Sequence, residues 1–283
     1  MKKKFYGISI VLIFILVIMP VSGCASQDNP DVQLPERGNY NPATMEDAAE
    51  HIYSHRGTCE GEIEHTFAAY DLAIFYGSGY IEQDVVVSRD GTLYVSHDPS
   101  ALRITGEDKL YSEMKDREID KLETKDGQNI LKLSDVFDRY GDNQEVCFLV
   151  EVKDVTAKDT LISMIRNYNF ESRVIVQSVD LPILQSVKEA LPEVRTLYVH
   201  QYQEEFETAL GLEYVDILGA KKTIMTQENC DAAHENGKIF SVWTLNSTEE
   251  IVTAIRLGVD TYFTDYTAKA FALEQTYRNI ETE

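Results

Sequence analysis

The feature that most constrains the fold is a regular alternation of short β-rich segments with amphipathic helical segments. The strand candidates are His51–His55, Tyr80–Val87, Val146–Val152, Arg173–Ser178, Arg195–His200, Tyr214–Leu218, Ile239–Leu245 and Thr261–Thr264. Helical patterns follow them near 65–76, 133–140, 158–168, 181–190, 203–211, 226–236, 247–257 and 267–279. Alternation of this kind favours a parallel sheet, and eight strands close a (β/α)8 barrel. We therefore predict an α/β fold of this type, the TIM barrel.

One stretch, from Pro99 to about Gln128, interrupts the alternation. It carries many charges with little periodicity, and it directly follows Leu93–His97, which has the pattern of a short extra strand. In such barrels the loops that follow the strands build the active site. We predict a small loop insertion after the second strand that serves as a substrate lid or specificity element.

The N-terminus has the layout of a secretory signal. Lys2–Lys4 precede an apolar run from Phe5 to Val21, and Val21-Ser22-Gly23-Cys24 follows. Small residues before a cysteine are typical of a lipoprotein cleavage site, so residues 1–23 are predicted to be a signal peptide and Cys24 the lipidated residue. The alternative is an uncleaved anchor, although the apolar run is slightly short of the ~20 residues of a bilayer span. Both interpretations place the protein outside the cytoplasm, held at the outer face of the cytoplasmic membrane or in the cell envelope.

The remainder suits one catalytic domain on a tether. Residues 24–45 are polar and contain Pro30, Pro35, Pro42 and Gly38, which indicates a flexible tether. Residues 46–283 then form the barrel domain. Residues 24–283 together are close to the ~250 residues typical of such a barrel.

The composition excludes some partners and some metals. The chain has 26 basic and 48 acidic residues, and removal of the three signal lysines changes the net charge from −22 to −25. This balance argues against nucleic acid and anionic membrane surfaces as direct partners. Cys59, Cys147 and Cys230 are an odd number without short metal-binding spacing, so neither a disulfide framework nor a zinc site is indicated. We expect mostly buried thiols.

Polar residues interrupt the early strand patterns near their C-terminal ends. They are His55, Arg56, Glu82, Asp84, His97, Glu151 and Lys153. Residues two apart in a strand face the same side, so Glu82 and Asp84 present their carboxylates together, as Glu151 and Lys153 present their charges. Unpaired charges buried in a barrel cost several kcal/mol each, so these groups must be paired or must hold a metal.

The three carboxylates suit a hard cation. With no cysteine nearby, Glu82, Asp84 and Glu151 are predicted ligands of one Mg²⁺ or Ca²⁺ ion rather than of zinc. The alternative is a structural network in which Arg56 and Lys153 neutralise the carboxylates. Both histidines lie at strand-to-loop turns. Histidines beside a metal act as general acid and general base near neutral pH, so His55 and His97 are the candidate catalytic residues.

These residues also carry a family resemblance. The motifs Ser54-His55-Arg56-Gly57, Ile63-Glu64-His65-Thr66-Phe67, Tyr80-Ile81-Glu82-Gln83-Asp84-Val85, Arg89-Asp90-Gly91-Thr92 and Val95-Ser96-His97-Asp98 resemble, in order and spacing, those of the glycerophosphodiester phosphodiesterases. The likeness continues through Leu102–Gly106, Leu149–Lys153, Ser241–Asn246, Gly258–Asp260 and Phe263–Tyr266. It covers most of the mature domain.

The resemblance implies roles for particular residues. His55 and His97 fall on the acid/base positions of the family, Glu82, Asp84 and Glu151 on its metal ligands, and Arg56 and Lys153 on phosphate contacts. Trp243 matches an aromatic at the barrel mouth that packs on the glycerol or head group, and ordinary core packing is its alternative. The implied activity is metal-dependent hydrolysis of glycerophosphodiesters to glycerol 3-phosphate and an alcohol, in the metabolism of phospholipid head groups.

The sequence also departs from the family pattern. His65 stands where the family has asparagine, which concerns the hydrogen bonds near the metal. Leu218–Lys222 lacks the expected substrate-contact pattern, and Thr267 replaces the usual proline after Tyr266. Two alternatives therefore remain: a lysophospholipase D-like or other phosphodiesterase activity at the same site, or a surface lipoprotein that binds without turnover.

Overall fold

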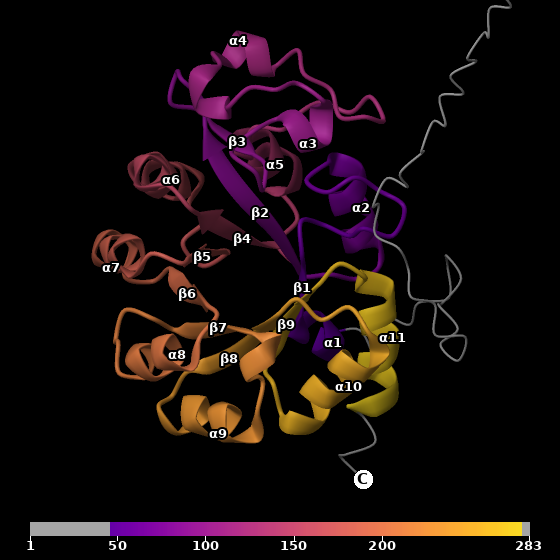
Figure 1. Cartoon of the computed structure of the whole chain (residues 1–283), viewed down its shortest axis with the longest axis vertical. Coiled ribbons are helices and arrows are strands. Elements are labelled where there is room, and N and C mark those ends of the chain that lie inside the picture. The colour runs from indigo at the N-terminus through magenta and orange to yellow at the C-terminus, as the bar shows by residue number, and fades with distance from the viewer. Residues whose placement is uncertain (1–45, 279–283) are drawn as a thin grey trace, which may run out of the picture.

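In the computed structural model, eight parallel strands close into a barrel with helices outside. The structure describes residues 46–278. The barrel strands are β1 (Ile52–Ser54), β2 (Tyr80–Val87), β4 (Cys147–Val152), β5 (Val174–Ser178), β6 (Arg195–His200), β7 (Ile217–Lys221), β8 (Ile239–Trp243) and β9 (Thr261–Thr264). Each pairs in parallel with its neighbours, and β1 pairs with both β2 and β9, which closes the ring (Figure 1). The predicted fold is confirmed.

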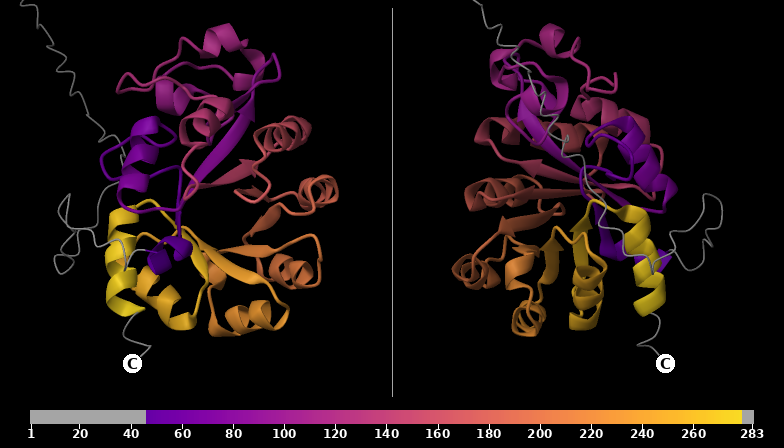
Figure 2. Two further views of the ribbon diagram at one scale, coloured as in Figure 1. Left: turned by 180° about the vertical axis from the view of Figure 1, so that it is seen from behind. Right: turned by 45° about the vertical axis from the view of Figure 1, so that its right-hand side comes forward.

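Eight helices follow the barrel strands and surround them in both views of Figure 2. They are α2 (Phe67–Phe75), α5 (Leu133–Tyr140), α6 (Val155–Tyr168), α7 (Leu181–Ala190), α8 (Gln203–Leu210), α9 (Gln227–Glu235), α10 (Thr248–Leu257) and α11 (Thr267–Tyr277). Helix α10 shows how local sequence sets a boundary. The Ser247 side chain accepts from the Glu250 amide, Glu250 reaches back to the Ser247 amide, and Gly258 ends the helix in the left-handed region.

Apolar residues fill two layers of the barrel. Between the strands and the helices lies the main core, which includes Ile81, Phe148, Val176 and Phe240. Inside the ring, a smaller set plugs the barrel: Tyr53, Leu149, Ile175, Leu197, Ile217 and Phe263. These side chains fill the barrel below its C-terminal mouth, so the polar residues at the strand ends lie directly above a packed apolar interior.

The predicted insertion has structure of its own. Strand β3 (Leu93–Val95) pairs antiparallel with the end of β2, which extends towards it in Figure 1. Beyond it come α3 (Leu102–Thr105), the 3₁₀ turn η2 (Tyr111–Glu113) and α4 (Asp116–Ile119). A separate apolar cluster holds the insertion together: Val86, Tyr94, Ala101, Ile104, Tyr111, Met114, Ile119 and Ile130. It is therefore a small packed layer rather than a plain loop.

The strand prediction was misplaced at β7, which runs from Ile217 to Lys221 instead of Tyr214 to Leu218. Gly219 and Ala220 have low β propensity, but β6 and β8 pair with this segment on both sides and impose the strand. A Cβ atom at Gly219 would lie 2.5 Å from Leu197 Cδ2, so any other residue there would displace this buried side chain. Helix α1 (Glu46–His51) and the 3₁₀ turn η3 (Lys222–Ile224) were not predicted.

Some predictions concern residues outside the described range. The signal peptide, Cys24 and the tether all lie before residue 46. Among the described helices, none combines the length and the apolar character that a membrane span requires. Within residues 46–278, Cys59, Cys147 and Cys230 form no disulfide, but only Cys230 is fully buried, so the expectation of mostly buried thiols was wrong for the other two.

Candidate active site

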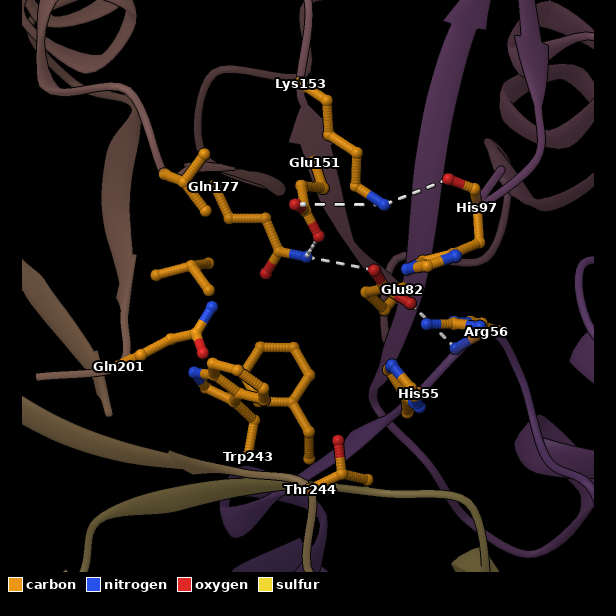
Figure 3. A pocket seen from close by; sticks show the side chains of 13 residues that line it. His55, Arg56, Glu82, His97, Glu151, Lys153, Gln177, Gln201, Trp243 and Thr244 are labelled. Carbon is orange, nitrogen blue, oxygen red and sulfur yellow. Dashed lines mark hydrogen bonds and ion pairs between the residues drawn. The ribbon is translucent and has the colours of Figure 1, made fainter. Parts of the chain in front are cut away.

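A pocket of about 220 Å³ opens at the C-terminal mouth of the barrel (Figure 3). Seven of the eight predicted barrel residues line it: His55, Arg56, Glu82, His97, Glu151, Lys153 and Trp243. The eighth, Asp84, is buried directly beside them, where it contacts both Arg56 and Lys153. Strands β1, β2 and β4 thus bring six of these residues together, and His97 after β3 and Trp243 at the end of β8 complete the set.

His55 follows β1 and is held by the far end of the chain. Its Nδ1 lies 2.6 Å from Asp265 Oδ1, just after β9. Asp265 is fixed in turn, because Asn246 Nδ2 donates to its Oδ2 at 2.6 Å and Asn246 Oδ1 accepts from its amide. The closure of the barrel between β9 and β1 therefore sets the orientation of the His55 ring.

His97 lies at the base of the insertion and is held by its neighbour in sequence. Its Nδ1 lies 2.7 Å from Asp98 Oδ1. Arg103, on α3, donates to Asp98 and also forms a two-pronged ion pair with Glu64 at 2.7 and 2.8 Å. Burial lowers the pKa of His97. The insertion thus contributes to the site through Arg103, which connects His97 to the loop after β1.

Glu82 and Asp84 point to the same side of β2, as predicted, and both are 1% exposed. Glu82 Oε2 accepts from the Arg56 amide at 2.8 Å, and its Oε1 accepts from Gln177 at 3.0 Å. Burial raises the pKa of Glu82 well above its ordinary range, and the Asp84 carboxylate adds to the shift. Burial alone would raise the pKa of Asp84 too, but the His65 hydrogen bond and Lys153 hold it well below its ordinary value.

Glu151 and Lys153 complete the charged side of the pocket. Lys153 Nζ lies 2.6 Å from Asp84 Oδ1 and 4.0 Å from Glu151 Oε1. Burial and the nearby Asp84 carboxylate raise the pKa of Glu151 to about 8. Three acidic groups, Glu82, Asp84 and Glu151, thus lie beside two cations, Arg56 and Lys153. A divalent cation would supply the missing positive charge.

The structure adds His65 to this cluster. One ligand-type atom from each of His65, Glu82 and Asp84 lies within 4.8 Å of the others, which makes them a group that could hold a metal ion. His65 was noted in the sequence only as a departure from a motif. Its proximity to Asp84 depends on a turn in which Arg56 and His65 both have positive φ and the His65 amide donates to the Arg56 carbonyl.

The side chain of Arg56 is ion-paired with two carboxylates of the protein. Its Nη1 lies 3.2 Å from Glu64 Oε1 and its Nε 3.4 Å from Asp84 Oδ2. The next residue, Gly57, has φ +92°, and a Cβ there would approach Ala69 Cβ to 2.8 Å. Glycine is therefore required for this turn, which aims the Arg56 amide at Glu82.

The opposite wall of the pocket carries residues that the sequence did not reveal. They are Gln177, Val179, Val199, Gln201, Thr244 and Phe263. Trp243 stands among them in Figure 3, and its Nε1 donates to the Gly219 carbonyl at 2.9 Å. This bond fixes the indole at the mouth, where Trp243 lines the pocket and also packs against the apolar cluster inside the barrel. Glutamine and valine near strand ends are common, so no local signal marked these four residues. Thr244 and Phe263 lie within recognised motifs, but no role was assigned to either.

Comparisons with known proteins identify the family. Residues 55–269 match the model of the glycerophosphoryl diester phosphodiesterase family. A glycerophosphodiester phosphodiesterase from Caldanaerobacter subterraneus subsp. tengcongensis is 30% identical over 76% of this chain and 93% of its own length. A structure from Silicibacter pomeroyi, described as a putative glycerophosphoryl diester phosphodiesterase, shares the fold with a TM-score of 0.73 and 21% identity, over 80% of this chain and 93% of its own. An Oleispira antarctica phosphodiesterase, solved with the product sn-glycerol-3-phosphate, has a TM-score of 0.67 and 21% identity over 79% and 96% of the two chains. The chain belongs to the glycerophosphoryl diester phosphodiesterase family, and the predicted enzyme class is confirmed.

Proposed function

We propose that this protein hydrolyses glycerophosphodiesters to glycerol 3-phosphate and an alcohol, with one divalent cation held by Glu82, Asp84 and Glu151. The observation that carries the proposal is the convergence, at one pocket, of two histidines, each paired with an aspartate, and three carboxylates that outnumber the two cations beside them. Family membership and the product-bound relative support the substrate class.

The donor set fits a hard cation. Three carboxylates offer oxygen ligands, which Mg²⁺ and Ca²⁺ prefer. When bound, such an ion polarises a phosphoryl oxygen and offsets the charge that develops there. Lys153 and Arg56 stand beside the same carboxylates and add positive charge towards the phosphate.

The two histidines suit the proton transfers of phosphodiester cleavage. Because Nδ1 of each ring is engaged by a carboxylate, Nε2 is the atom presented to a substrate. One ring removes the proton of the nucleophile, which is a water or the adjacent glycerol hydroxyl, and the other protonates the leaving alkoxide. Attack by the hydroxyl forms a cyclic phosphate, which a water then opens to glycerol 3-phosphate. Trp243 and the uncharged wall receive the glycerol or the alcohol.

The test is product release by the purified protein. Glycerophosphocholine and glycerophosphoethanolamine are supplied with and without EDTA, and Mg²⁺ or Ca²⁺ is then restored while glycerol 3-phosphate is measured. We expect release that EDTA abolishes and one of the ions restores. Binding of the substrates without release under any condition would instead support a surface lipoprotein that binds without turnover.

A second substrate class has one observation in its favour. A cavity of about 580 Å³ adjoins the pocket, because His97 and Lys153 line both, and Val86, Val87 and Tyr111 give it an apolar wall. A lysophospholipid could place its head-group phosphate in the pocket and its apolar portion in this cavity. Including lysophosphatidylcholine in the assay separates the two classes, since turnover of this lipid above that of glycerophosphocholine would favour the second.

The cellular location belongs to the same proposal. We propose that cleavage after Gly23 and lipidation of Cys24 anchor the domain at the outer face of the cytoplasmic membrane or elsewhere in the cell envelope. Metabolic labelling with a palmitate analogue tests this. Label should appear in the wild-type protein and be lost in Cys24→Ser, whereas equal labelling of both would contradict the proposal.

A further inference from the structure

His65 occupies an unusual place beside the proposed metal ligands. It is 3% exposed, and its φ of +58° lies in the left-handed region, which histidine and asparagine enter more readily than most residues. The ring spans two polar partners: Nε2 lies 2.9 Å from Asp84 Oδ2, and Nδ1 lies 2.9 Å from the Tyr70 hydroxyl. Two roles are open to such a ring, a direct metal ligand or a hydrogen-bond donor that fixes Asp84.

The hydrogen-bond chemistry distinguishes these roles. An ionised carboxylate only accepts hydrogen bonds, so the contact with Asp84 requires a proton on Nε2, whatever the charge of the ring. A nitrogen that carries a proton has no lone pair for a metal. In the neutral ring Nδ1 is then the acceptor, and the buried Tyr70 hydroxyl is positioned to donate to it. Both ring nitrogens are thus occupied.

The other neighbours of Asp84 agree with this assignment. Its Oδ2 receives the His65 bond and lies 3.4 Å from Arg56 Nε, while Oδ1 is paired with Lys153 at 2.6 Å. His65 and Lys153 therefore hold different oxygens of the same carboxylate. Donors that hydrogen-bond to a metal ligand commonly orient it and alter its affinity for the ion.

We propose that His65 is a positioning residue that donates from Nε2 to Asp84 and is not itself a metal ligand. The proposal rests on the metal site described above and refines it, because it leaves an all-oxygen donor set. Such a set favours Mg²⁺ or Ca²⁺, whereas a ring nitrogen in the set would favour transition metals. The role of His65 thus decides which class of cation the site selects.

The first experiment measures the affinities of Mg²⁺, Ca²⁺, Mn²⁺ and Zn²⁺ by calorimetry for the wild type, His65→Ala and His65→Asn. We expect His65→Ala to weaken all four ions by a similar factor, about 10- to 100-fold. His65→Asn, which keeps an amide donor suited to the same backbone, should recover most of the loss. His200→Ala is the matched control: this buried histidine bonds the Tyr198 carbonyl, lies outside the pocket lining, and should leave the affinities unchanged.

Two spectroscopic measurements use the wild-type protein and therefore do not depend on whether a variant folds. Nitrogen-15 NMR of the metal-free protein should show His65 protonated at Nε2, and electron–nuclear double resonance of bound Mn²⁺ should show no directly coordinated ring nitrogen. A coordinated nitrogen, or a loss in His65→Ala that is much greater for Zn²⁺ and Mn²⁺ than for Mg²⁺ and Ca²⁺, would overturn the role of His65 while leaving the metal site intact. A wild-type protein that binds none of the four ions would overturn the metal site itself.

Discussion

The two halves of the pocket differ in charge and in how they are built. Strands β1, β2 and β4 supply the charged half, with His55, Glu82 and Glu151 as its centre, and His97 joins them from the insertion. From β5 to β9, the described residues that line the pocket are uncharged: Gln177, Val179, Val199, Gln201, Trp243, Thr244 and Phe263. In Figure 3 Gln201 and Trp243 lie across the opening from the charged group, while Gln177 stands beside Glu151 and donates to Glu82.

This difference suggests separate tasks for the two halves: the charged half for the reaction and the uncharged half for recognition of the substrate. Hydrogen bonds hold the side chains of the charged half in place, since each histidine has its own aspartate and Glu82 is bonded by both Arg56 and Gln177. Fixed side-chain orientations of this kind suit one reaction geometry. The uncharged half offers amides, methyl groups and one indole, which suit shape and hydrogen-bond recognition of an alcohol. Changes in the first half should therefore reduce turnover, and changes in the second should alter substrate affinity.

Removal of either histidine should have the largest effect. For His55→Ala and His97→Ala we expect turnover to fall at least ~10²-fold, because general acid–base catalysis is lost. Metal affinity measured by calorimetry should stay near the wild-type value, since neither ring is a proposed ligand. Near-normal turnover of His97→Ala would remove this residue from the catalytic assignment.

Replacement of Asp265 and replacement of Asp98 should lower turnover to different extents. Asp265 and His55 are about one-fifth exposed, while Asp98 and His97 are more open, at 29% and 38%. A hydrogen bond to a charged group contributes ~1.5 kcal/mol or more, or about tenfold in rate, and exposure weakens it. We expect Asp265→Ala to lower turnover about tenfold and Asp98→Ala clearly less. Steady-state kinetics of both variants decide the order, and the reverse order would contradict the orienting role of Asp265.

Changes in the uncharged half should act on KM. Gln201→Ala removes one amide from the pocket wall, for which we expect KM to rise about fivefold with kcat nearly unchanged, consistent with ~1 kcal/mol for a neutral hydrogen bond. Trp243→Phe keeps an aromatic face but loses the bond to the Gly219 carbonyl, and its effect should also fall mainly on KM. A fall in kcat with unchanged KM in both variants would break the division between the two halves.

Arg103 should give the smallest effect, mainly on stability. Burial would raise the pKa of Glu64, but the hydrogen bond from Arg103 lowers it to about 2, below the ordinary 4.5. A depressed folded-state pKa stabilises the fold above pH 4.5, and this contribution disappears as the pH falls towards 2. Arg103→Met should therefore cost about 1 kcal/mol at pH 7, or ~2–4 °C in Tm, because the pair is partly exposed. Calorimetric scans from pH 7 down towards pH 2 should show the difference shrinking below pH 4.5; a constant difference would assign it to packing.

The sequence predicted the charged half and missed the uncharged half for a physical reason. Carboxylates and histidines in buried strand patterns are costly and therefore conspicuous, which is how Glu82, Asp84 and His97 were found. Gln177 and Gln201 are ordinary residues at strand ends, and only barrel closure brings them to the pocket. Asp265 lay within a recognised motif, but its partner His55 is 210 residues away in sequence, so the pairing required the fold.

The fold itself was predictable where local patterns agreed with tertiary pairing. Strand β2 and helix α10 matched the prediction within a residue, because alternation in the first and capping in the second are local signals. At β7 the segment around Gly219 has no such signal, and its neighbours decide the register. The internal structure of the insertion was missed because its short helices are stabilised by contacts with Tyr94 and Val86 of the hairpin β2–β3 rather than by their own periodicity.

The most direct test of the account compares the metal dependence of turnover in the wild type and in Glu82→Gln. Release of glycerol 3-phosphate from glycerophosphocholine is followed after EDTA treatment and stepwise return of Mg²⁺ or Ca²⁺. We predict full recovery in the wild type, and in Glu82→Gln a turnover lower by about 10²-fold or more, because a bound cation supplies several kcal/mol of charge stabilisation. Equal recovery of both proteins at the same ion concentration would contradict the assignment of the metal to the charged half of the pocket.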